Sequence, residues 1–213
     1  AAIIIYQKID QVMLGNMIDK TAVGYYSVAG KFTEICLFIP TILSQTITPV
    51  LVKAYHNDLK DYQKKAASFM NITIWGTIII CIVICLISRP LIKYTFGTEY
   101  AAAVTLLQIM IFKTIGYASA QITGAFIVIE KKQKYVVIRN IIGCVVCIGL
   151  NLLLIPRYGV TGAAMASVIT AICTGYFSHL FIPTYRSYFY TQTYSFILGW
   201  KDLIVGIFNR LKK

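Results

Sequence analysis

Long apolar runs alternate with short charged strips along the chain, and this pattern predicts six membrane-spanning helices. The predicted spans cover residues 1–17, 22–52, 68–88, 101–129, 135–155 and 160–182. The third run has 21 residues without a charged side chain. Prolines are expected to end three of the spans: Pro90 ends the third, Pro156 the fifth and Pro183 the sixth. Because about 20 apolar residues suffice to cross a bilayer, the second run is expected to bend, tilt or protrude, with Pro40 and Pro49 inside it.

The composition indicates an all-α, polytopic membrane protein. Apolar residues make up 58% of the 213 residues, charged residues only 13%, and the mean hydropathy is +0.71. Soluble domains usually carry about 25% charged residues. The first run, 1–14, would rise only about 21 Å as a helix, which is short of the roughly 30 Å hydrocarbon core. We therefore expect the chain to be a piece of a longer protein, cut inside or just before a membrane helix.

Lysine and arginine are distributed unevenly between the two sets of strips. Of the 20 such residues, 13 lie in strips 53–67 and 131–139 and in the tail, against four in the alternate strips. The positive-inside rule then places both ends of the chain in the cytoplasm. This count includes Arg139, which is expected to extend to the inner membrane surface. The net charge of +12 is therefore explained by the positive-inside rule and by contact with anionic lipid headgroups, and does not indicate binding of nucleic acid.

Residues 183–213 are predicted to form a separate cytoplasmic tail. Apolar residues recur in it at helical spacing, while charged and amide side chains interrupt the run. This pattern favours a basic amphipathic helix on the inner leaflet, although a solvated helix or a frayed tail also fits it. The apolar positions are Ile197, Trp200, Ile204, Phe208 and Leu211.

Five ionisable residues lie inside the predicted spans: Lys8, Asp10, Lys31, Glu34 and Lys113. On a helical wheel Lys31 and Glu34 are about 60° apart, whereas Lys8 and Asp10 are about 160° apart and should not both face one neighbour. An ionisable group within a span usually faces a polar cavity or a partner. These charges therefore indicate a central cavity of net positive character, pairing of the charges with each other, or side chains that extend to the membrane surface near span ends, as Lys8 and Asp10 could at the outer surface.

Two polar stripes extend this pattern and provide the candidate site. In the second span Gln45 lies near Glu34 on the wheel, and in the fourth span Tyr117 and Gln121 follow Lys113 at four-residue steps. An anionic substrate is expected to contact Lys31, Lys113, Lys8, Tyr117, Gln121 and Gln45. Glu34 and Asp10 are the candidates for ion coupling, and Glu34 is equally suited to pairing with Lys31.

Catalytic motifs are not apparent. The sequence has no Walker loop, HExxH or dinucleotide-binding glycine motif, and it has only two histidines and eight acids. The six cysteines lie in apolar runs and are expected to pack as small side chains, so no metal and no cofactor is predicted. Transport is favoured over enzymatic activity.

Two segments resemble the bacterial O-antigen and polysaccharide flippases of the multidrug/oligosaccharidyl-lipid/polysaccharide exporter superfamily. The first, "DQVMLGNMIDKTAVGYYSVAGKFTE", begins at Asp10 and continues into "FIPTILSQTITPVLVKAY", and the second is "NLLLIPRYGVTGAAMASVIT" from Asn151. With the spacing between them they cover about residues 6–182. The resemblance implies the C-terminal six-helix lobe of a two-lobe (6+6) fold, so a six-helix N-terminal lobe is missing.

The same resemblance implies a function. It predicts movement of undecaprenyl-diphosphate-linked oligosaccharide repeat units across the bacterial inner membrane by alternating access, driven by an ion gradient. Lys31 and Lys113 match the family's cavity cations. Expected partners are the lipid-linked oligosaccharide, anionic membrane lipids, the missing lobe and polysaccharide polymerase machinery. A drug/cation antiporter, a lipid II flippase and a membrane-embedded glycan polymerase or ligase remain alternatives.

Overall fold

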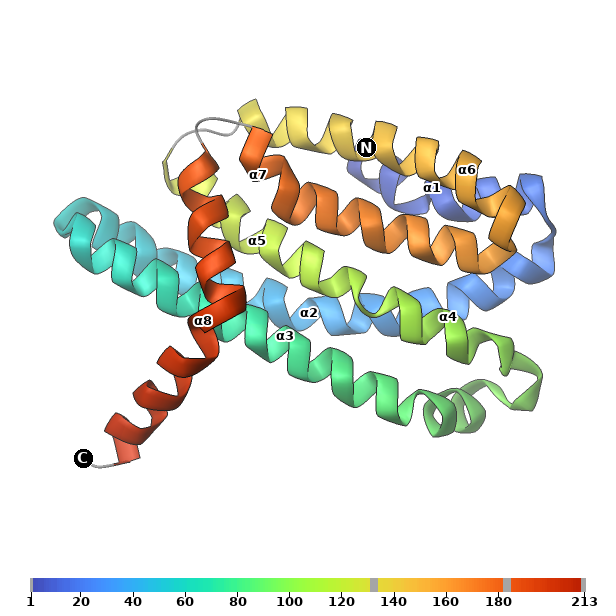
Figure 1. Cartoon of the computed structure of the whole chain (residues 1–213), viewed down its shortest axis with the longest axis horizontal. Coiled ribbons are helices and arrows are strands. Elements are labelled where there is room, and N and C mark those ends of the chain that lie inside the picture. Colours follow the sequence, from blue (N-terminus) through green and yellow to red (C-terminus); the bar gives the residue numbers. More distant parts are fainter. Residues whose placement is uncertain (1, 131–133, 182–184, 212–213) are drawn as a thin grey trace.

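Helices make up all the regular structure in the part of the chain that the computed structural model describes, residues 2–130, 134–181 and 185–211. Figure 1 shows an elongated bundle of long helices, with α8 crossing it obliquely on the outside. The elements are α1 (Ala2–Met17), α2 (Lys20–Asn57), α3 (Leu59–Phe96), the 3₁₀ turn η1 (Thr98–Tyr100), α4 (Ala102–Met110), α5 (Lys113–Ile129), α6 (Lys134–Ile172), the π-helical η2 (Cys173–Phe177), α7 (Ser178–Phe181) and α8 (Arg186–Leu211).

Four stretches of the described residues are long and apolar enough to cross a membrane: Lys20–Asn57, Leu59–Phe96, Ala102–Ile129 and Lys134–Leu180. With 16 residues, α1 is shorter than a full crossing requires. The predicted number of six spans therefore stays a prediction. The end expected for the sixth span, at residues 182–183, lies outside the described residues.

Prolines that were expected to end spans lie within helices instead. α3 continues through Pro90, and α6 continues through Pro156. Pro40 and Pro49 lie inside α2 in the same way. A proline removes one backbone hydrogen bond, but in a membrane-type helix neighbouring groups can compensate and the helix continues. The stop predicted at Pro90 is wrong for this reason, whereas the stretch from Lys134 reverses direction at Gly159, three residues after Pro156.

The stretch from Lys134 contains a sharp reversal at Gly159. Its backbone angles, φ 59° and ψ −137°, belong to a region that glycine adopts without strain. Figure 1 shows the two arms of α6 running back beside each other from this point. A Cβ atom at Gly162 would overlap the carbonyl of Leu154, so glycine also permits the close approach of the two arms.

The helix α8 is part of the bundle over its first half. Gln192 and Ser195 are fully buried, and the Trp75 indole of α3 donates a hydrogen bond of 2.9 Å to the Ser195 carbonyl. The predicted tail is thus helical from Arg186, while its position on the inner leaflet stays a prediction. The side chains of Ile204, Phe208 and Leu211, which were expected to form its apolar face, lie outside the described set.

A carboxylate at the end of α5 links three helices. Glu130 accepts hydrogen bonds from the hydroxyl groups of Tyr188 on α8 and Tyr62 on α3, the latter at 3.5 Å. Burial, and then the bond to the Glu130 carboxylate, raise the pKa of Tyr188 well above its usual value. Both tyrosines also pack near Phe126, which fixes α8 at this end of the bundle.

Candidate functional site

A half-exposed ion pair joins α1 and α2. Lys8 Nζ lies 3.1 Å from Glu34 Oε1, and the two side chains are 50% and 56% exposed. Lys8 lies nine residues before the end of α1 and Glu34 lies 14 after the start of α2. At 1.5 Å per residue these offsets are about 14 and 21 Å along the two helices, so the pair joins the helices well away from the α1–α2 connection.

This pair settles one alternative for Glu34. The sequence allowed pairing with Lys31 on the same helix, but the structure pairs Glu34 with Lys8. The helical wheel also placed Lys8 and Asp10 on different sides of their helix, yet both side chains contact α2. The long side chain of Lys8 reaches Glu34, and the carboxylate of Asp10 accepts a hydrogen bond from Tyr26. The expectation that Lys8 and Asp10 could not face one neighbour is therefore wrong.

Asp10 lies behind this ion pair in a buried polar cluster. Only 6% of Asp10 is exposed, and its carboxylate accepts hydrogen bonds from Tyr26 Oη at 2.7 Å, Asn151 Nδ2 at 2.6 Å and Cys147 Sγ at 3.1 Å. The donors come from α2 and from the first arm of α6. Asn151 Oδ1 is buried and has no hydrogen-bond partner among the described residues. The cluster therefore holds one carboxylate and one free carbonyl oxygen away from solvent.

Lys113 lies where the third apolar stretch is interrupted. α4 ends at Met110 and α5 begins at Lys113, and Thr114 N and Ile115 N bond three residues back, at 3.1 and 3.2 Å. Such tight turns within a span often mark functional sites. Lys113 is partly buried and interacts electrostatically with Asp10, Glu34 and Lys8. The break thus places a cation next to the charges of α1 and α2.

The remaining predicted site residues lie along α2 and α5, which pack against each other. Lys31 and Gln45 are exposed on α2. Gln121 Nε2 donates a hydrogen bond of 3.2 Å to Thr41 Oγ1, so the two polar stripes meet there. Tyr117, on the turn of α5 between Lys113 and Gln121, is partly buried. Contacts of Lys8, Lys113 and Gln121 with α2 therefore join α1, α2 and α5 into one surface, which we call the wall.

Four residues of this region were missed by the sequence analysis: Tyr26, Thr41, Cys147 and Asn151. Cys147 and Asn151 are four residues apart and so share a face of α6, which was the available signal. Cys147 was expected only to pack, but its thiol donates to Asp10.

Arg139 also differs from its expected position. The side chain is 7% exposed, and its Nη1 lies 3.4 Å from the Ala120 carbonyl oxygen on α5. It is therefore part of the contact between α5 and α6 and does not extend to the inner surface as predicted. Among the described residues, no group of three or more His, Cys, Asp or Glu side chains could hold a metal ion.

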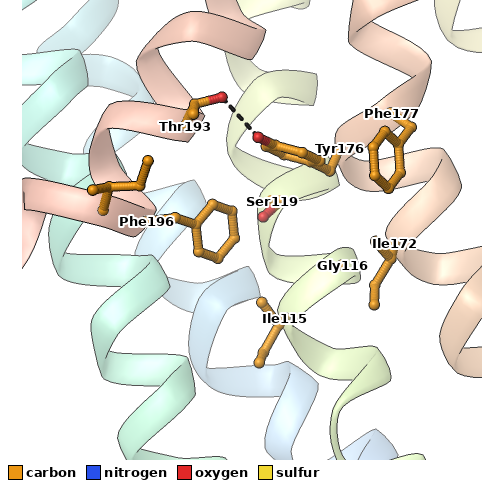
Figure 2. A pocket seen from close by; sticks show the side chains of 9 residues that line it. Ile115, Gly116, Ser119, Ile172, Tyr176, Phe177, Thr193 and Phe196 are labelled. Carbon is orange, nitrogen blue, oxygen red and sulfur yellow. Dashed lines mark hydrogen bonds between the residues drawn. The ribbon is translucent and has the colours of Figure 1, made fainter.

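An apolar cavity of about 360 Å³ lies apart from these charges, between α5, η2 and α8. Figure 2 shows Phe196, Ile115 and Ile172 around it, and the Tyr176 and Thr193 hydroxyl groups bonded to each other at 2.7 Å. This lining suits hydrocarbon and offers no charged group to a phosphate or a sugar.

The described residues form an all-helical protein with four helices long and apolar enough to span a membrane, and a charged wall formed by α1, α2 and α5. A family described as "Polysaccharide biosynthesis protein" matches residues 2–105. The chain is 25% identical over 165 residues to the capsular polysaccharide biosynthesis protein CapF of Staphylococcus aureus. This matched region covers 76% of the chain and 41% of CapF. The matched region is thus less than half of that relative. Both similarities support a polysaccharide-related role.

Proposed function

We propose that this chain is one lobe of a flippase that moves undecaprenyl-diphosphate-linked oligosaccharide repeat units from the inner to the outer leaflet of the bacterial inner membrane. It does so by alternating access with a second lobe and changes no covalent bond, so it is not an enzyme. The similarity to a capsular polysaccharide biosynthesis protein supports a glycan substrate. The four apolar stretches support a location in the membrane.

The observation that carries the proposal is a pair of cations, Lys31 and Lys113, within helices that are long and apolar enough to span a membrane. Lys113 interacts electrostatically with Lys8 and Glu34, Lys31 lies three residues before Glu34 on α2, and neither lysine is in a salt bridge among the described residues. A lysine inside a membrane is unfavourable unless it meets water or an anion. The diphosphate of a lipid carrier supplies that anion, and Lys31 and Lys113 bind it in this proposal. Tyr117, Gln121 and Gln45 then offer hydroxyl and amide groups along the same wall.

Six crossings fit the proposal if α1 is the outer part of a span that begins upstream and the two arms of α6 cross separately on either side of Gly159. The second lobe then closes the cavity in front of α1, α2 and α5. The basic strips place both ends of the chain in the cytoplasm, near anionic lipids and the polysaccharide polymerase machinery.

Asp10 is the coupling group in this account. Glu34 is neutralised by Lys8, whereas Asp10 has only neutral hydrogen-bond donors and lies beside the free Asn151 Oδ1. A proton or a monovalent cation entering this cluster compensates the buried carboxylate charge. The cluster joins α1 and α2 to α6, so its occupation can change how these helices pack.

The test is the replacement of Lys113 by Ala in the full-length protein, in cells that depend on it for surface polysaccharide. We expect the loss of at least nine-tenths of the polysaccharide with an unchanged amount of protein in the membrane. Lys113→Arg keeps the charge and should retain part of the activity. Lys93→Ala, an exposed lysine on α3 outside the wall, is the matched control. Normal polysaccharide with Lys113→Ala rules out the assignment of the anion site.

A further inference from the structure

A second cavity lies at the opposite end of the bundle from the α2–α3 connection, between the start of α2 and the turn η1. It measures about 390 Å³ and is lined by Lys20, Thr21, Gly24, Tyr25, Glu99 and Tyr100. This volume falls in the range of small-molecule sites. We call it the outer cleft, because the uneven lysine and arginine distribution places this end of the helices outside the cytoplasm.

Two aromatic rings are held in place on one side of the outer cleft. The rings of Tyr25 and Tyr100 meet edge to face, with centroids 5.8 Å apart, and Tyr100 also contacts Phe96 at 5.7 Å. Both tyrosines are partly buried and pack against the core formed by α1 to α4 and α6. Their positions are therefore set by the fold before any ligand arrives.

Charges of both signs complete the lining. Lys20 and Glu99 are exposed, and neither is in a salt bridge among the described residues. An ammonium group donates hydrogen bonds and a carboxylate accepts them, so together they match ligands that carry hydroxyl groups. An anionic headgroup would be repelled by Glu99. Rings beside free donors and acceptors match a sugar, which has an apolar C–H face and a rim of hydroxyl groups.

The outer cleft opens toward the side of α2 that carries the proposed diphosphate site. At 100° per residue, Lys20, Gly24 and Lys31 fall within about 40° of one another on the wheel of α2. Tyr25 precedes Glu34 by nine residues, or about 14 Å along the helix. A glycan attached to a diphosphate at Lys31 can therefore extend along this face toward the cleft.

We propose that the outer cleft binds sugar residues of the oligosaccharide, at the end of the lobe where the glycan leaves the cavity. This assignment rests on the proposed function and adds a glycan subsite separate from the diphosphate site. The tyrosine rings contact the sugar face, and Lys20, Glu99 and Thr21 bond its hydroxyl groups.

Gly24 allows a steric test. A Cβ atom added at Gly24 meets no atom within 4 Å, so Gly24→Leu should fill the cleft without disturbing the fold. The probe is the free repeat-unit oligosaccharide, released from the host's lipid carrier by mild acid and titrated calorimetrically into the purified full-length protein. We expect at least tenfold weaker binding to Gly24→Leu. Gly76→Leu, at a glycine of α3 with equally open surroundings, should bind as the wild type does.

Other outcomes separate this proposal from the proposed function. Equal affinity of the wild type and Gly24→Leu, in a protein that still moves the lipid-linked unit, overturns the cleft and leaves the flippase function standing. A wild type that moves no lipid-linked unit in vesicles overturns both. In a third outcome, the wild type binds glycerol phosphate but not the oligosaccharide, and Gly24→Leu abolishes the binding of glycerol phosphate. This result shows an anion site and overturns the sugar assignment. Glu99→Gln should weaken oligosaccharide binding several-fold without changing the thermal midpoint.

Discussion

Asp10 carries a structural role as well as the proposed coupling role, because three side chains from two helices donate to its carboxylate. Asp10→Ala leaves the buried Tyr26 hydroxyl and Asn151 amide without this acceptor. Each buried donor left unpaired costs about 1–3 kcal/mol, so the free energy of unfolding should fall by roughly 2–4 kcal/mol. The measurement is the thermal midpoint of the purified protein in detergent.

Glu34 gives the matched comparison for Asp10. Its ion pair with Lys8 is half-exposed, and such pairs contribute about 0–1 kcal/mol. Glu34→Ala should therefore lower the thermal midpoint much less than Asp10→Ala does. Equal shifts for the two variants contradict the distinction between a buried cluster and an exposed pair.

The charged residues could be predicted from the sequence, but their partners could not. A lysine or an acidic residue within an apolar run can be recognised from the sequence alone. The sequence therefore identified all five of these residues: Lys8, Asp10, Lys31, Glu34 and Lys113. Whether Lys8 or Lys31 pairs with Glu34 depends on the angle at which α1 packs against α2, and helical spacing contains no information about that angle. For the same reason Asn151 was not connected to Asp10.

At the scale of elements, glycine contacts fix how α5 packs on η2. A Cβ atom at Gly175 would overlap the Gly116 carbonyl oxygen, and one at Gly116 would overlap the backbone of Ala171. Gly175→Ala should force these helices apart and lower the thermal midpoint by several degrees. Gly124→Ala, in the same α5 but with open surroundings, should leave the midpoint unchanged or raise it, because alanine is the better helix former.

A fall in the midpoint for Gly124→Ala as large as that for Gly175→Ala contradicts this packing account. Gly116 and Gly124 lie in the same helix, but an added Cβ atom would overlap a neighbouring backbone at Gly116 and would meet no atom within 4 Å at Gly124. A glycine therefore permits a close approach, while the crossing point depends on the partner helix.

Element boundaries were less predictable than the elements themselves. The apolar runs predicted where helices lie, but α2 and α3 each continue for 38 residues, past prolines and into polar sequence. Hydropathy reports the part of a helix that suits lipid, and a helix can extend into water where local propensity and packing support it. The π-helical turn at Cys173–Phe177 has no sequence signal that distinguishes it from an α-helix.

At the scale of the whole molecule, α2 and α3 form a long hairpin. α2 and α3 are about 57 Å long at 1.5 Å per residue, so their connection at Asp58 extends beyond a bilayer. Figure 1 shows this hairpin projecting past the other helices. The half-exposed charges on the wall of α1, α2 and α5 fit the proposal that this surface faces a second lobe across water.

The most direct test of the flippase proposal follows the lipid-linked substrate itself. The full-length protein is reconstituted into vesicles that contain undecaprenyl-diphosphate oligosaccharide, and periodate added outside reports the glycan that is accessible. The account predicts that the wild type exposes the glycan initially confined to the inner leaflet, that Lys113→Ala slows this exposure at least tenfold, and that Lys93→Ala does not. Vesicles in which the wild type leaves the inner-leaflet glycan protected, or in which Lys113→Ala works as fast as the wild type, contradict it.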